Sequence, residues 1–182
     1  MTNIIEVIKE YFQTKLDDEP KSPLHVGEVM NCWMYLTIMD ESSVYLEIGI
    51  NTTTDDEVKH ILMESLEQCQ TQANRVRDFL INEGIPLPPT SEQRPKSNPN
   101  EIPLGAKLTD EEIINGLSIK TVTAIMQCAT TISQAVRNDV AGLFTHALLE
   151  KMKFGMNLKE AMKKRGWIKV PPYYYPPGKT NN

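Results

Sequence analysis

The pair Glu57 and His60 forms a Glu-x-x-His motif, the nearest approach to a known metal-binding pattern in this sequence. In four-helix bundles, residues at this spacing lie one turn apart and can supply two ligands of a di-iron site. Such ligands must point into the bundle. On the expected helix, however, the pair falls on a separate stripe from the apolar one that contains Val58, Leu62 and Cys69. The spacing therefore predicts a pair that faces solvent and no metal site there.

Other side chains of catalytic type are scattered along the chain. The histidines form no pairing with a serine or cysteine that spacing can support. The cysteines Cys32, Cys69 and Cys128 lack a Cys-x-x-Cys spacing, which indicates reduced thiols in an intracellular protein. There is no phosphate-binding or dinucleotide-binding glycine motif. We expect no catalytic residues, no cofactor and no metal.

Two acids and one base fall on faces that we expect to point inward. Asp40 and Glu47 continue a seam at intervals of seven from Val26 and Trp33, and Lys151 lies in the apolar stripe of its own helix. A buried charge is costly unless it is paired. The pattern predicts an ion pair of Lys151 with Asp40 or Glu47, or else long side chains that reach the bundle edge. The two acids are also the candidate ligands if a metal binds.

The elements that position these residues are helices. Apolar side chains recur at helical spacing, and threonines with a glutamate three residues later predict helix starts at Thr54 and Thr109. Residues 85–107 contain six prolines and no helical period. We expect helices over about 3–16, 24–51, 55–83, 109–134 and 138–165.

A connection as long as 85–107 suits a crossover that runs along a bundle. The whole chain, 1–182, is then expected to form one domain. Its fold class would be all-α: an elongated ferritin-like four-helix bundle whose second and third long helices are parallel, followed by an extended Pro- and Tyr-rich tail over 167–182. The alternative is an up-down bundle with a disordered loop.

Net charge and hydropathy limit the partners and the cellular location that the sequence predicts. A net charge of -5 argues against nucleic acid as a partner. No apolar run is long enough for a membrane span, and acids near the N-terminus disfavour a secretory signal. These features predict an intracellular, cytoplasmic protein.

Four segments carry a resemblance to a known family. PLHVGEVMNCWMYLT, DFLINEGIPLPP, LTDEEI and KKRGWIKVPPYYYP resemble a ferritin-like family of unknown function from spore-forming Bacillus-type bacteria, which is related to the spore coat F-like proteins. The resemblance implies a ferritin-like bundle that belongs to the spore or its coat. Those coat relatives often carry acidic and histidine residues in the last helix, whereas residues 150–156 here contain no histidine.

The leading hypothesis is a non-enzymatic structural or interaction protein that self-associates as a dimer and contacts other spore proteins. Tyr35, Met39 and Leu46 fall opposite the seam, where they would pack under another segment or form the dimer surface. The tyrosines at 173–175 would fold back over the bundle or dock on a neighbour. The alternatives are an atypical metal-binding oxidoreductase that uses Asp40 and Glu47, or a bundle that binds an apolar small molecule between the first and last long helices, where Gly155 leaves space.

Overall fold

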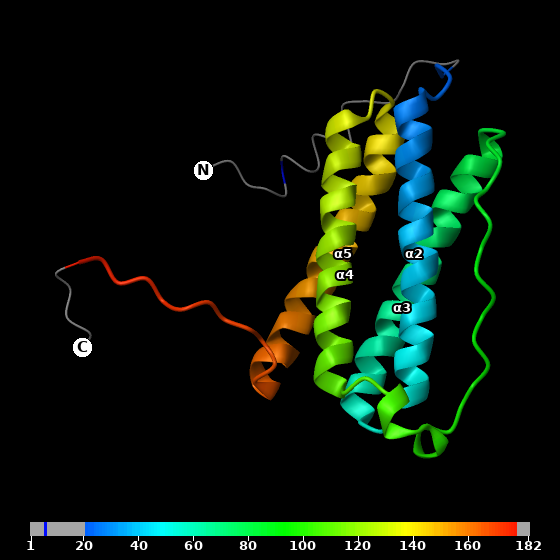
Figure 1. Cartoon of the computed structure of the whole chain (residues 1–182). Helices are drawn as coiled ribbons and strands as arrows, with labels where there is room; N and C mark the ends of the chain where they lie inside the picture. The colour runs from blue at the N-terminus through cyan, green and yellow to red at the C-terminus, as the bar shows by residue number, and fades with distance from the viewer. Residues whose placement is uncertain (1–5, 7–20, 178–182) are drawn as a thin grey trace.

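Four long helices make up most of the described part of the chain, which comprises residue 6 and residues 21–177. The computed structural model has no strand within these residues, so the predicted all-α class is confirmed. Each long helix begins and ends within two residues of its expected bounds. The helix expected over 3–16 lies outside the described residues, apart from Glu6. In chain order the helices are α2 (Val26–Thr52), α3 (Asp56–Asn82), η1 (Pro99–Glu101), η2 (Leu104–Ala106), α4 (Asp110–Gln134) and α5 (Asn138–Arg165) (Figure 1).

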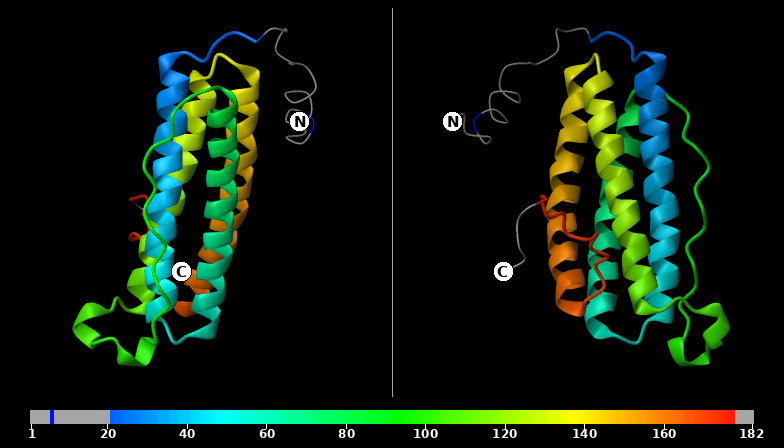
Figure 2. Two further views of the ribbon diagram at one scale, coloured as in Figure 1. Left: turned by 90° about the vertical axis from the view of Figure 1, so that its right-hand side faces the viewer. Right: turned by 60° about the vertical axis from the view of Figure 1, so that its left-hand side comes forward.

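The connection between α3 and α4 runs the length of the bundle, as the prolines of 85–107 predicted (Figures 1 and 2). As a result, α3 and α4 run in one direction, and α2 and α5 run in the other. α2 and α5 each pack beside both α3 and α4, so α2 and α5 lie diagonally opposite one another. The crossover is tied to α2: Asn51 Nδ2 donates to the carbonyl of Pro95 at 2.9 Å, and the backbone N–H of Arg94 donates to Glu47 Oε2 at 2.8 Å.

Capping residues explain where the helices start. At α4 the predicted capping box is confirmed: the Glu112 N–H donates to Thr109 Oγ1 at 3.2 Å, and the Thr109 N–H donates to Glu112 Oε2 at 2.8 Å. At α3 the predicted N-cap, Thr54, is wrong by one residue. Asp55 caps the helix instead and accepts from the Val58 N–H at 3.0 Å. An ionised carboxylate also interacts favourably with the positive end of the helix dipole, which a threonine hydroxyl cannot do as strongly.

The side of α2 that faces the core is not the predicted seam. Val26 is 85% exposed, and Trp33, Asp40 and Glu47 are only partly buried. Apolar residues occur all around α2, so periodicity alone could not choose between its faces. The packing of α3 and α4 makes the choice, and the crossover runs along the Glu47 side. The residues that were expected on the opposite face, and as a candidate dimer surface, lie in the core: Tyr35, Met39 and Leu46.

A buried arginine joins three helix ends at one end of the bundle. Arg137, in the turn before α5, is 3% exposed. Its guanidinium donates to Glu83 Oε2 at 2.7 Å and to Asp139 Oδ2 at 2.6 Å. The buried carboxylate of Glu28, in the first turn of α2, accepts the backbone N–H groups of Val136 at 2.9 Å and Arg137 at 2.8 Å. We call this cluster of Glu28, Glu83, Arg137 and Asp139 the upper clasp.

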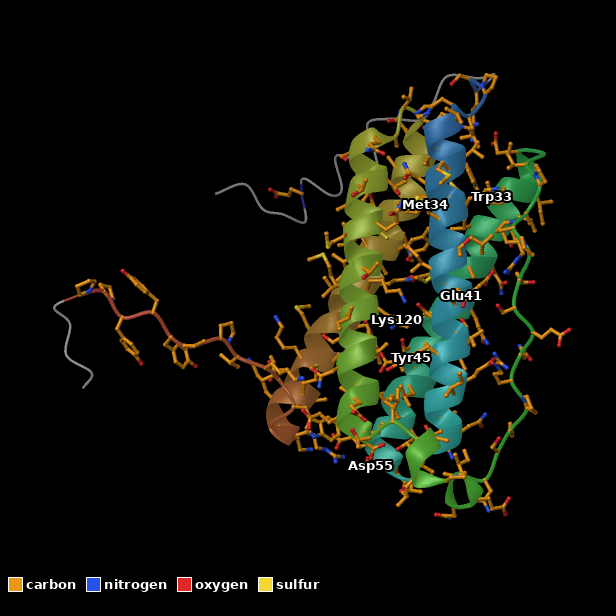
Figure 3. The ribbon with its side chains drawn as sticks, in the orientation of Figure 1. Trp33, Met34, Glu41, Tyr45, Asp55 and Lys120 are labelled. Atoms are coloured by element: carbon orange, nitrogen blue, oxygen red, sulfur yellow. The ribbon has the colours of Figure 1, made fainter. Side chains whose placement is uncertain are left out.

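A second arginine joins α5 to α3 at the opposite end, where Figure 3 labels Asp55. Arg165 donates to Asp55 Oδ2 at 2.8 Å and to Glu57 Oε2 at 2.6 Å. Its guanidinium carbon also lies 5.2 Å from the centre of the Trp167 ring. We call this group the lower clasp. The two clasps fix both ends of α5 against the first hairpin.

None of the helices within residues 21–177 has the combination of length and apolarity that crossing a bilayer requires.

Candidate functional site

The Glu-x-x-His pair lies on the solvent side of α3, as predicted, because Glu57 and His60 are both exposed. Hydrogen bonds from Arg165 and then from Lys164 lower the pKa of the Glu57 carboxyl. The ionised Glu57 carboxylate is therefore part of the lower clasp. Among residues 21–177, no three His, Cys, Asp or Glu side chains gather closely enough to hold a metal ion. That no metal binds remains a prediction.

Lys151 is buried, at 3% exposed, but it pairs with no carboxylate among residues 21–177. Its Nζ donates to Cys69 Sγ at 3.4 Å. Asp40 pairs with Arg77 instead, at 3.3 Å between Oδ1 and Nη2, and Glu47 accepts a backbone N–H from the crossover. The predicted pair of Lys151 with Asp40 or Glu47 is therefore wrong. The rotation of α2 turns both acids toward α3 and the crossover, whereas Lys151 enters the core from the diagonally opposite helix.

Asp40 and Glu47 do line a common pocket of about 370 Å³ between α2, α3 and the crossover. Burial raises the pKa of Asp40, and Arg77 opposes this effect. A cation bound in the pocket would have to compete with Arg77 for the Asp40 oxygens. The geometry thus gives no support to the metal-ligand role considered for these two acids.

A chain of hydrogen bonds leads from the bundle centre to its surface. The hydroxyl of Tyr35 donates to Gln72 Oε1 at 2.7 Å, and Gln72 Nε2 donates to Glu150 Oε2 at 2.7 Å. Arg75 then donates to Glu150 Oε1 at 2.9 Å, and His146 Nδ1 lies 3.3 Å from the same oxygen. Burial opposes ionisation of Glu150, but bonds from Gln72 and Arg75 outweigh it and lower its pKa. We call this chain the buried polar relay; it links α2, α3 and α5 and runs from the buried Tyr35 to the exposed Arg75 and His146.

The three thiols are free and buried, with Cys32 and Cys128 fully inaccessible and Cys69 2% exposed. Burial raises the pKa of Cys32 to about 12 and that of Cys128 to about 11. The thiolate is the reactive form of cysteine. Cys32 and Cys128 therefore behave as core residues rather than as nucleophiles at neutral pH.

Tyr45 locks α2 against α4 and was not anticipated from the sequence. Figure 3 shows Tyr45 and Lys120 between these two helices. The Tyr45 hydroxyl donates to the Ile113 carbonyl at 2.8 Å, and Lys120 Nζ lies 5.1 Å from the centre of the ring. The Tyr45 hydroxyl oxygen fits because residue 116 is a glycine. Any Cβ at residue 116 would collide with that oxygen.

Apolar side chains remain exposed on the outer surface of α4 and α5. On each helix they recur at intervals of three and four residues, so each set forms one stripe. Because the two helices are antiparallel neighbours, the stripes lie side by side. We call this surface the α4/α5 outer face. Its six exposed residues are Ile119, Val122, Met126, Leu149, Met152 and Met156.

A groove of about 330 Å³ lies within this face and is lined mainly by apolar side chains. Gly155 forms part of its floor, and a Cβ there would touch Thr121 at 3.4 Å. Gly155 thus leaves space between α4 and α5, not between the first and last long helices as predicted. We call this depression the α4/α5 groove. Its lining residues include Val122, Ile125, Met152, Met156, Met162 and Ile168.

The tyrosines of the tail do not fold back over the bundle. Tyr173, Tyr174 and Tyr175 are 77%, 82% and 58% exposed. The tail leads away from α5 in Figure 1. Of the two expectations for these residues, folding back is wrong.

Comparison with known proteins supplies several relatives. The family described as "protein of unknown function (DUF3231)" matches residues 12–180. The protein YvdQ of Bacillus subtilis, described as uncharacterized, is 29% identical over 152 residues, which are 84% of this chain and 89% of that protein. A crystal structure from Bacillus halodurans, described as a "putative spore coat protein", is 30% identical, covers 85% of this chain and 98% of its own, and has a TM-score of 0.82. An Anabaena variabilis structure with DJ-1-like and ferritin-like domains, 15% identical, shares the fold alone; it covers 92% of this chain and 49% of its own, with a TM-score of 0.63.

Proposed function

Because the chain belongs to the DUF3231 family of proteins of unknown function, we propose a function from its surface: a non-enzymatic structural protein of the spore that self-associates through the α4/α5 outer face. The resemblance to a Bacillus family of unknown function is confirmed by this membership and by YvdQ. The spore assignment follows the description of the Bacillus halodurans relative, which covers most of this chain.

The exposed apolar stripes carry the proposal. Met126 and Met156 are 64% and 61% exposed, and Ile119 is 69% exposed. Single exposed apolar residues are ordinary, but six in two adjacent stripes around a groove are typical of an interaction surface. The core of the bundle does not need them, since α4 buries a separate stripe that includes Ile113, Leu117 and Cys128.

The interior supports a structural role. In the buried polar relay the side chains bind one another, and both clasps consist of paired charges. Groups that satisfy each other in this way stabilise and orient helices. A catalytic group needs a reacting atom within hydrogen-bonding reach. The hollows that Tyr35 and Lys151 line measure only about 10 Å³ each, which is too small for a substrate.

Sedimentation velocity over a wide concentration range tests this function. We expect wild type to dimerise and Met126→Asp to shift the protein toward monomer, because a buried, unpaired carboxylate opposes association. Met63→Asp is the matched control, since Met63 is 54% exposed on α3, away from the outer face. A wild-type protein that stays monomeric throughout would contradict the proposal.

A second candidate function rests on the α4/α5 groove alone. Its volume of about 330 Å³ falls at the lower end of small-molecule sites, roughly 300–1,000 Å³. If the groove binds one apolar ligand, an apolar dye should bind the monomeric protein at one molecule per chain, and its fluorescence should change on binding. Dye binding that disappears as the dimer forms would favour the self-association surface.

A further inference from the structure

The C-terminal tail begins beside the α4/α5 groove and then leaves it. Gly166 ends α5 with a φ of 71°, a left-handed conformation that favours glycine. The Trp167 N–H donates to the Met162 carbonyl at 2.9 Å, and the partly buried Ile168 lines the end of the groove. From Val170 onward the residues are exposed, and Figure 1 shows the chain projecting from the bundle. We call residues 170–177 the arm.

The composition of the arm makes it stiff. Four of its eight residues are prolines, which fix φ and favour the extended polyproline conformation. At about 3.1 Å per residue, the arm spans roughly 25 Å. To enter its own groove, the chain would have to bend back toward the bundle at Val170, directly before Pro171 and Pro172. A residue that precedes a proline is itself held extended, so this bend is disfavoured.

The chemistry of the groove suits tyrosine rings. Met152, Met156 and Met162 line it, and methionine sulfur makes favourable contacts with aromatic edges. Tyrosine can bury its ring there while its hydroxyl reaches the polar rim, where Ser118 and Lys159 lie. The groove-lining residues of α5 run from Met152 to Met162, about 15 Å at 1.5 Å per residue, which is long enough for the three consecutive tyrosines of the arm.

We propose that the arm of one copy of this chain docks in the α4/α5 groove of a second copy, with the exchange made reciprocally in a two-fold dimer. This inference rests on the proposed self-association and names the segment that mediates it. Three exposed tyrosines on a stiff arm, next to an apolar groove that the same arm does not fill, are complementary surfaces on one molecule. A reciprocal exchange buries two arms in two grooves at once, so the assembly closes as a dimer.

A complementation experiment with full-length variants tests the exchange. The arm variant carries Tyr173→Ser, Tyr174→Ser and Tyr175→Ser. The groove variant carries Val122→Asp and Met156→Asp. We expect each variant alone to be monomeric at concentrations where wild type is dimeric. Mixed in equal amounts with different tags, they should form a heterodimer, because one intact arm can still meet one intact groove. An arm with three Tyr→Phe substitutions is the control and should dimerise.

The other outcomes separate the inference from the proposed function. If both variants remain dimeric, neither the arm nor the α4/α5 outer face forms the interface, and the inference and the proposed surface are both wrong. If each variant is monomeric and the mixture stays monomeric, the docking is not an exchange between copies, and the inference is wrong. If only the groove variant is monomeric, another segment or ligand occupies the groove. If wild type itself is monomeric, the proposed function fails together with the inference.

Discussion

At the scale of single residues, the centre of this bundle contains more polar side chains than the apolar stripes of its helices suggest. Tyr35, Gln72 and Lys151 are all at most 3% exposed, yet each meets a polar atom of another helix. A buried polar group costs free energy when its partner is lost, so such contacts favour one arrangement of the helices over others.

Tyr35→Phe should lower the free energy of unfolding by about 1–3 kcal/mol, because it leaves Gln72 Oε1 buried without its 2.7 Å donor. Chemical denaturation monitored by circular dichroism measures the change. Tyr173→Phe is the control, since that hydroxyl is exposed, and should have almost no effect. Equal effects of the two substitutions would show that the relay does not stabilise the fold.

Lys151→Met should leave the stability unchanged or raise it by about 1 kcal/mol or more, since the contact of the buried Lys151 Nζ with the Cys69 sulfur recovers little of its lost hydration. Lys153→Met, two residues along and exposed, serves as the control. The urea concentrations at which wild type and the two variants are half unfolded measure these changes in stability. A large loss of stability in Lys151→Met would indicate an essential charged partner.

The burial of Lys151 could be predicted from the sequence, but its partner could not. The apolar stripe of the last helix already placed this lysine inward. Its contact with Cys69 depends on how α3 is rotated, and the alternative with Asp40 depended on an incorrect rotation of α2. Contacts between helices require knowledge of every neighbour, which periodicity along one helix does not contain.

At the scale of elements, the helix bounds were predictable because local chemistry fixes them. Pro86 and Gly166 end helices, and Thr109 starts one, without reference to the rest of the chain. The face that α2 presents was not predictable, since its outer side is also apolar at Met30 and Met34. The upper clasp was missed for a related reason: Glu28 and Arg137 are far apart in sequence, and neither belongs to a motif.

Arg137→Met should lower the free energy of unfolding at pH 7 by about 2–3 kcal/mol, because it removes the guanidinium from the partly buried carboxylates of Glu83 and Asp139. Arg94→Met, an exposed residue of the crossover, should change stability by less than about 0.5 kcal/mol. Thermal and urea denaturation of both variants measure the difference.

The same variant predicts a dependence on pH. Burial opposes ionisation of Asp139, but hydrogen bonds from Arg137 and Lys21 outweigh it and lower its pKa. Ionised Asp139 therefore stabilises the folded state above the ordinary aspartate value of about 3.9, and the contribution is lost as the pH falls through the lowered pKa. The stability gap between wild type and Arg137→Met should narrow below about pH 4. A gap that is constant down to pH 2 would contradict this assignment.

At the scale of the whole molecule, the bundle consists of two hairpins joined by a long crossover. The α2–α3 and α4–α5 pairs bury one shared core, while the crossover lies outside it and is exposed along most of its length. The crossover therefore determines which helices are parallel, but it contributes little burial to the folded state.

Within the crossover, limited trypsin digestion should cut first after the exposed Lys96, because exposed loops are the preferred sites of cleavage. The two fragments should elute together on gel filtration and separate only in denaturant, since the core and both clasps are untouched. Lys96→Gln should slow the first cut. Fragments that separate under native conditions would show that the crossover is needed to hold the hairpins together.

The three buried cysteines can report which helix of this molecule moves away from the core. Cys32, Cys69 and Cys128 belong to α2, α3 and α4, one thiol on each, and all three are at most 2% exposed. A thiol-specific reagent can modify each one only when its helix moves away from the core. The order in which the three are modified would therefore tell which helix detaches first, without any label being added to the chain.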